Sequence, residues 1–109
     1  CFPVSPALAQ NVPFFVGKWY VADAKVCKSK PGEAEGLLTY TDKKMFGYEN
    51  HCDIARMTPN GKRIELRMNC SGEGEKYRQT DIVEMQGDKL KVTRTADGRT
   101  LLLTYPRCP

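Results

Sequence analysis

The sequence predicts an all-β protein, a small antiparallel up-and-down barrel of seven or eight strands. Residues 62–70 carry the clearest strand pattern, because apolar and polar side chains alternate there with a period of two. Turn signals that contain glycine flank this strand at residues 58–61 and 71–74. No segment predicts a helix, and a length of 109 residues fits one domain. Together these features indicate short strands joined by tight turns.

The first predicted strand, residues 14–23, follows Pro13 and holds the single tryptophan of the chain. Its odd positions are expected to face the interior, and they are Phe15, Gly17, Trp19 and Val21. Gly17 and Trp19 are predicted to form the floor of the barrel. A loop with a Pro-Gly turn signal follows at residues 24–34, and the second strand covers residues 35–41.

Residues 45–57 are predicted to form one bent strand, with the bend or bulge at residues 47–50 because a glycine interrupts the pattern there. One face of this strand is expected to carry Phe46, Tyr48, Cys52 and Ile54. The turn at residues 58–61 is expected to pair Thr58 with Lys62. After the strand at residues 62–70, three more strands are predicted at residues 75–85, 89–95 and 99–105.

The amino-terminal segment indicates export. Ala7, Leu8 and Ala9 precede Gln10 and form an A-x-A cleavage site, so residues 1–9 are predicted to be the tail of a secretory signal peptide. The barrel domain then covers residues 10–109, and the expected location is periplasmic or secreted. The alternatives are an ordinary mature amino terminus or a lipidated Cys1.

Four cysteines remain after residues 1–9, and an even number in a small exported domain implies two disulfides. In the predicted register Cys52 and Cys70 are diagonal neighbours on one face, which a bulge can bring within disulfide range. If residues 45–57 are one strand, the first and last strands end at the same rim, beside Cys27 and Cys108. The predicted disulfides are therefore Cys52–Cys70 and Cys27–Cys108. The cysteine spacings fit no zinc template, and no metal site is predicted.

Charge and motif content favour a binding protein over an enzyme. The net charge of +4 is scattered along the chain and indicates a solvated surface. The sign of the charge would suit nucleic acid, but an exported protein rarely meets it, so no nucleic-acid partner is expected. No cofactor is expected, and no apolar run is long enough for a membrane helix. Glu73 and Glu75 lie on a turn with no evident burial to separate their pKa values. His51 is the only histidine and has no nucleophile motif to serve, so it is interpreted as an ordinary strand residue.

The hairpin at residues 70–78, CSGEGEKYR, gathers the groups best suited to bind a partner. Its glycines permit unusual backbone conformations, and a disulfide at its base would hold it in one shape. The alternative interpretation is a plain solvated hairpin. The predicted partner-binding residues are Ser71, Gly72, Glu73, Lys76, Tyr77 and Arg78.

The segment GKWYVA, with Phe15 just before it, resembles the G-x-W signature of the lipocalin superfamily. The size, the export signal and the disulfides more closely resemble small bacterial barrels of the same shape. Two such groups are inhibitors, one of c-type lysozymes in the periplasm and the other of secreted metallopeptidases. The chain is also similar to four-cysteine exported proteins of alphaproteobacteria.

The lysozyme inhibitors carry a loop of the form S-x-S-G-x-x-Y that enters the lysozyme active site. Ser71-Gly72 and Tyr77 resemble this loop, with a spacing that differs by two residues and without the first serine. The resemblance implies that Ser71 and Tyr77, helped by Lys76 or Arg78, face the catalytic carboxylates of the target. The metallopeptidase inhibitors instead reach a catalytic zinc with their amino-terminal segment, which corresponds to residues 10–14 here.

The resulting hypothesis is a non-enzymatic binding protein that inhibits c-type lysozyme by inserting a loop into its active site. The alternatives are a carrier of a small apolar ligand beside Trp19 and a metallopeptidase inhibitor. An inhibitor is expected to have an interior filled by Trp19, Phe46, Leu66, Met68 and Leu103. A carrier is expected to have a cavity of at least ~300 Å³ in the same place.

Overall fold

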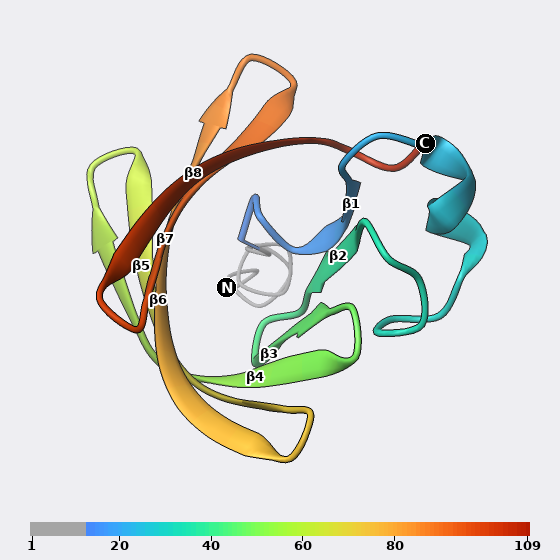
Figure 1. Ribbon diagram of the computed structural model, residues 1–109. Coiled ribbons are helices and arrows are strands. Elements are labelled where there is room, and N and C mark those ends of the chain that lie inside the picture. The colour runs from blue at the N-terminus through green and yellow to red at the C-terminus, as the bar shows by residue number, and fades with distance from the viewer. Residues whose placement is uncertain (1–12) are drawn as a thin grey trace, which may run out of the picture.

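Eight strands pair with their neighbours in chain order and curl into a nearly closed antiparallel barrel, as the computed structural model shows for residues 13–109 (Figure 1). The strands are β1 (Gly17–Tyr20), β2 (Leu37–Tyr40), β3 (Lys44–Gly47), β4 (Asn50–Asn60), β5 (Arg63–Gly72), β6 (Glu75–Gln86), β7 (Lys89–Ala96) and β8 (Arg99–Pro106). The predicted all-β barrel is confirmed. The predicted cleavage site after Ala9, and residues 10–12 of the amino-terminal segment, lie outside the described residues.

Strand β1 is shorter than predicted and contains Trp19. The chain turns at Phe14 and Phe15 before the strand begins, and the Trp19 indole Nε1–H donates to the Phe15 carbonyl at 2.9 Å. Phe15 and Trp19 are fully buried, as predicted. The inward prediction for Val21 is wrong, because the chain leaves the sheet after Tyr20 and Val21 is 57% exposed.

The loop predicted at residues 24–34 contains a short 3-10 helix, η1 (Ala24–Lys28). Asp23 caps it, since its carboxylate accepts a hydrogen bond from the Lys25 backbone N–H at 2.9 Å. The Lys18 ammonium donates to the carbonyls of Cys27 and Ser29 at 3.2 and 2.9 Å. These bonds bring the loop back along β1, so that Cys27 lies level with the middle of that strand.

The prediction of one bent strand at residues 45–57 is wrong, because the chain reverses completely at Tyr48 and Glu49. Strands β3 and β4 form a hairpin in which Met45 pairs with Cys52. The reversal places residues on faces that a single strand would not give them. Met45 is buried, whereas Tyr48, expected on the face of Cys52, is 47% exposed.

Strands β4 and β5 form a long hairpin whose register differs from the prediction. The turn consists of Gly61 and Lys62, so Asn60 pairs with Arg63 and the expected Thr58–Lys62 pair does not form. A bulge between Ile54 and Arg56 then shifts the register. The shift brings Cys52 directly opposite Cys70, and the predicted disulfide between them is confirmed.

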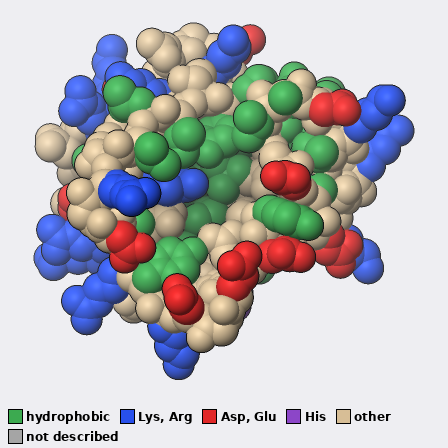
Figure 2. Space-filling model, in the orientation of Figure 1, with side chains coloured by type: hydrophobic (Ala, Val, Ile, Leu, Met, Phe, Trp, Pro, Cys, Tyr) green, Lys and Arg blue, Asp and Glu red, His purple; other side chains and the backbone are tan. Residues whose placement is uncertain are grey.

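The barrel interior is a hydrophobic cluster that includes both cysteines of this disulfide. Its members are Phe15, Trp19, Leu38, Tyr40, Met45, Cys52, Leu66, Met68, Cys70, Val83, Leu90, Val92 and Tyr105. Of the expected filling residues, Trp19, Leu66 and Met68 are buried as predicted, while Phe46 and Leu103 are only half-buried. Figure 2 looks onto the same end as Figure 1 and shows hydrophobic side chains gathered at the centre, with charged side chains around them.

A charged network lies inside the barrel among these apolar residues. The Asp81 carboxylate is fully buried, accepts a hydrogen bond from the Tyr40 hydroxyl at 2.6 Å and forms two with the Arg94 guanidinium at 2.9 and 3.0 Å. Gln79 donates a further bond to it at 3.1 Å. Burial, reinforced by the nearby Asp81 charge, raises the pKa of the Tyr40 hydroxyl well above its ordinary value. Burial alone would lower the pKa of Arg94, but its bonds to Asp81 outweigh that and raise it.

The two ends of the sheet meet at Trp19. This residue forms a bridge with Arg107, and the Cys108 backbone N–H donates to the Lys18 carbonyl at 3.0 Å. The Arg107 guanidinium lies over the Trp19 ring, 4.1 Å from its centroid, which adds a cation–π contact. The Cys27–Cys108 disulfide closes the same junction and confirms the second predicted pairing.

Among the described residues, no helix has the length and the hydropathy to span a lipid bilayer.

Candidate functional site

The hairpin between β5 and β6 turns through only two residues, Glu73 and Gly74. Gly72 and Glu75 pair directly below the turn. Both turn residues have positive φ, 52° for Glu73 and 79° for Gly74, as in the type I′ turns whose twist matches that of paired strands. The predicted four-residue turn at residues 71–74 is therefore tighter, and the strands extend almost to the tip.

Two side-chain connections hold this hairpin to the neighbouring hairpin of β3 and β4. One is the Cys52–Cys70 disulfide, two residues below Gly72 on β5. The other is a hydrogen bond of 2.8 Å from the Asn50 side-chain amide to the Tyr77 hydroxyl. Gly47 and Gly72 flank Asn50 closely, and a Cβ atom added at Gly72 would lie 2.7 Å from the Asn50 Cβ. Because both neighbours are glycine, the Asn50 side chain fits between the two hairpins.

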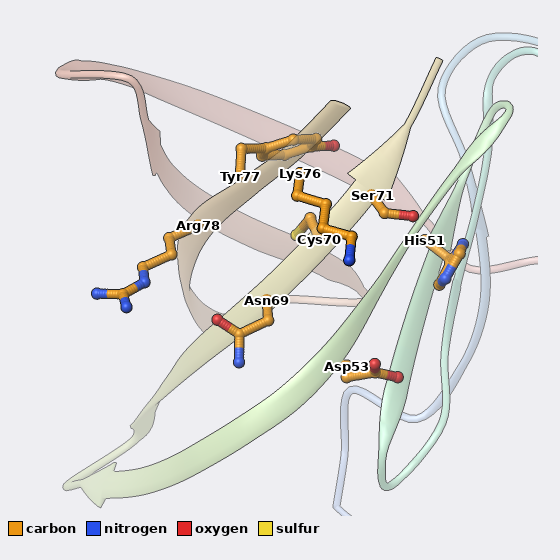
Figure 3. A pocket seen from close by; sticks show the side chains of 8 residues that line it. All are labelled: His51, Asp53, Asn69, Cys70, Ser71, Lys76, Tyr77 and Arg78. Atoms are coloured by element: carbon orange, nitrogen blue, oxygen red, sulfur yellow. The ribbon is translucent and has the colours of Figure 1, made fainter. Parts of the chain in front are cut away.

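The outer face of this sheet carries two rows of polar side chains across three strands. His51, Ser71 and Lys76 form the row nearer the tip, since His51 pairs with Ser71 and Ser71 with Lys76. Asp53, Asn69 and Arg78 form the next row in the same way. Both rows line a surface hollow of about 520 Å³, together with Cys70 and Tyr77 (Figure 3). We call this the polar hollow.

The predicted partner-binding residues all belong to this hairpin, and the structure divides them into two groups. Ser71, Lys76, Tyr77 and Arg78 line the polar hollow. Gly72 and Glu73 line only the two smaller hollows at the tip, together with Glu49 and Glu75. Tyr77 also lines one of these tip hollows, and Ser71 and Lys76 also line the other. The tip is therefore acidic, whereas Lys76 and Arg78 make the adjoining outer face basic.

Sequence reasoning did not place His51, Asp53 and Asn69 in the polar hollow. It also missed Asn50, which supports the hollow through its bond to Tyr77. Asp53 and Asn69 reach the hollow only through strand register, and the predicted register would have placed Asn69, in place of Ser71, opposite His51. Asn50 was expected in a bend, and no local pattern indicated its bond to Tyr77. Only the Cys52–Cys70 pair, if used to set the register directly, could have placed His51 opposite Ser71.

The polar hollow combines cationic groups with hydroxyl groups. Lys76 and Arg78 supply cationic donors, and no carboxylate within the described part of the chain lies within 4 Å of either one. Ser71 and Tyr77 supply hydroxyl groups. His51 pairs with Ser71 across β4 and β5, but among residues 13–109 the His51 side chain forms no hydrogen bond. In the same residues, no three His, Cys, Asp or Glu side chains are arranged to hold a metal ion.

The barrel interior offers little space beside Trp19. Trp19, Leu66, Val83, Leu90 and Val92 all have an exposed fraction of 0%. A side chain that lined a cavity large enough for water would retain exposed area. These five side chains are therefore covered on all sides, and no water-sized space borders them.

The fold and the hairpin define a class of protein: a small antiparallel barrel, closed by one disulfide and stiffened by a second beneath an exposed hairpin. No family model, curated protein or solved structure matches the chain. The case for a function consequently depends on the geometry of the hairpin and of the polar hollow.

Proposed function

We propose that this chain is an exported protein without catalytic activity that inhibits c-type lysozyme by inserting its β5–β6 hairpin into the active site. The observation that carries the proposal is the rigidity of the hairpin. A two-residue turn, the Cys52–Cys70 disulfide and the Asn50–Tyr77 bond hold it before any partner arrives. A preorganised loop loses little conformational entropy on binding, so more of its contact energy appears as affinity.

The donors beside the hairpin suit a target that acts through two carboxylic acids, as retaining glycosidases do. The Tyr77 hydroxyl already accepts a bond from Asn50, which leaves its proton free to be donated to a carboxylate. Ser71 supplies a second hydroxyl and Lys76 a positive charge from the outer face of the sheet, whereas Tyr77, which pairs with the buried Cys70, is on the opposite face. A cation held between two carboxylates would block both the acid and the nucleophile.

The acidic tip restricts how the hairpin can enter such a site. Glu73 and Glu75 would repel the catalytic carboxylates at close range. The insertion therefore has to present the face with Ser71 and Lys76, while Glu73 points toward solvent or toward basic groups at the rim of the cleft. This orientation makes Lys76 the residue whose charge matters most.

The two disulfides support a location outside the cytosol, because such bonds persist mainly in oxidising compartments. A periplasmic or secreted protein would meet lysozyme at the cell wall. The carrier alternative is less well supported, since the residues around the expected cavity have no exposed area. The metallopeptidase alternative depends on residues 10–14, of which only Pro13 and Phe14 are described.

The test is the rate at which a c-type lysozyme lyses a bacterial cell-wall suspension, measured with increasing amounts of the purified protein. Inhibition at micromolar excess is expected. Lys76→Gln and Ser71→Ala are each expected to weaken it by about tenfold or more, because a charge-assisted bond is worth roughly 1.5–3 kcal/mol.

Lys89→Gln is the matched control, because Lys89 is exposed at the start of β7 and lines none of the hollows around the hairpin. It removes the same charge and should leave inhibition unchanged. Absence of inhibition by the folded wild-type protein would reject the proposal. Equal losses in Lys76→Gln and Lys89→Gln would show that net charge, and not the hairpin, is responsible.

A further inference from the structure

A second hollow on the outer face, distinct from the tip of the hairpin, contains three arginines. It measures about 310 Å³ and is lined by Ala55, Arg56, Arg67, Met68, Asn69, Arg78, Gln79 and Thr80. The arginines come from three adjacent strands, β4, β5 and β6. We call this the arginine hollow.

Strand register forces two of these arginines together. Arg56 and Arg67 are directly paired across β4 and β5, immediately after the bulge between Ile54 and Arg56. Like charges directly opposite each other on a sheet face destabilise it. Arg78 lies diagonal to Arg67, because Arg67 pairs with Thr80 and Asn69 with Arg78.

Only one of the three arginines has a carboxylate near enough to neutralise its charge within the described residues. Arg67 has one acidic neighbour, Glu65, at 3.4 Å. Arg56 and Arg78 have none within 4 Å in the part of the chain that the structure describes. The three arginines therefore repel one another in the free protein, and a bound anion would relieve this repulsion.

We propose that the arginine hollow binds a tetrahedral oxyanion, a phosphate or sulfate group carried free or as a monoester. Guanidinium groups present donors in a planar fork that matches such an anion, and they do so more effectively than lysines. The Thr80 hydroxyl and the Asn69 amide line the same hollow and add uncharged donors. Phosphate is favoured over a carboxylate, because its larger charge and three acceptor oxygens can serve more than one arginine.

This site does not rest on the proposed inhibition of lysozyme. Its ligand chemistry is read from Arg56 and Arg67, which lie outside the hairpin tip, and its test uses the protein alone. The two proposals can therefore fail separately.

The experiment measures thermal unfolding of the wild-type protein at pH 7.5 with low millimolar sodium phosphate, against sodium chloride at the same ionic strength. Phosphate is expected to raise Tm above the chloride value, because a ligand that binds only the folded state stabilises it by mass action. Inorganic sulfate, pyrophosphate and vesicles containing phosphatidic acid then distinguish a free anion from a phosphorylated headgroup.

Two variants distinguish binding in the arginine hollow from a general effect of charge. Arg56→Gln removes one of the facing charges, so it should raise Tm in chloride and lower the affinity for phosphate about tenfold or more. Arg99→Gln, an exposed arginine on β8, is the matched control and should preserve the phosphate response. NMR signals of the arginine side chains should shift with phosphate at Arg56, Arg67 and Arg78 only.

Three results would overturn the proposal. The first is a phosphate response no larger than that of chloride at matched ionic strength. The second is an equal loss of the response in Arg56→Gln and Arg99→Gln, which would indicate diffuse charge. The third is shifts spread over all arginines, which would mean nonspecific adsorption.

Discussion

At the scale of single residues, the structure explains why the alternation of apolar and polar residues in β6 is interrupted at Asp81. The alternation of apolar and polar positions slips near Asp81, Ile82 and Val83 in the sequence. In the structure Asp81 points into the barrel, where Tyr40 and Arg94 satisfy its oxygens. No local pattern predicts that partnership, because the three residues lie on β2, β6 and β7.

Stability should fall at high pH because Tyr40 is held neutral in the folded state. Burial raises the pKa of Tyr40, and burial also raises the pKa of Tyr105. In the unfolded chain a tyrosine loses its proton near pH 10, so above about that pH the unfolded state binds fewer protons and is favoured. The contribution of each such tyrosine to the unfolding free energy should be constant below pH ~10 and then fall by about 1.4 kcal/mol per pH unit.

Denaturant titrations from pH 8 to 11.5 measure this slope. Tyr40→Phe should lower stability at pH 8 by about 1–2 kcal/mol through the lost bond to Asp81 and reduce the slope above pH 10. Tyr48→Phe is the control, since Tyr48 is 47% exposed. A slope that persists unchanged in Tyr40→Phe would contradict the assignment.

At the scale of elements, hairpins determine which residues face one another. Residues 45–57 carry a glycine and an asparagine that indicate an interruption, but a bulge and a full reversal leave similar traces in sequence. The reversal at Tyr48 and Glu49 moves Met45 inward and brings Asn50 beside Tyr77. The candidate site depends on the contact between Asn50 and Tyr77.

The Asn50–Tyr77 bond should contribute to stability as a coupled pair. Asn50→Ala and Tyr77→Phe should each lower the unfolding free energy by about 1 kcal/mol, because each removes the same hydrogen bond. The double variant should cost clearly less than the sum of the two, and chemical denaturation of all four proteins measures the coupling. Strict additivity would mean that the bond does not stabilise the hairpin.

At the scale of the whole molecule, closure of the barrel depends on contacts between residues far apart in sequence. The Cys27–Cys108 pairing was predicted from seven strands that end at one rim, whereas the barrel has eight. The pairing is correct for a different reason. The loop with η1 folds back along β1, and Lys18 holds the Cys27 carbonyl beside the end of β8.

The disulfide that closes the barrel should stabilise it more than the one beneath the hairpin. The sequence separations are 81 for Cys27–Cys108 and 18 for Cys52–Cys70. Loop entropy in the unfolded chain then predicts losses of about 4.5 and about 3 kcal/mol when each pair is replaced by serine. Urea denaturation of the two paired Cys→Ser variants under oxidising conditions measures the difference. The reverse order would indicate that native packing outweighs loop entropy.

The sequence by itself determined the all-β class, most strand positions, the presence of two disulfides and the hairpin that carries the candidate site. These follow from local information: alternation at residues 62–70, glycine in the turns and an even number of cysteines after residue 9. The tertiary structure alone decided register, the inward charge at Asp81, the link from Asn50 to Tyr77 and the facing arginines at positions 56 and 67. A strand's pattern reports which side chains share a face, but a shift of one residue changes every partner across the sheet.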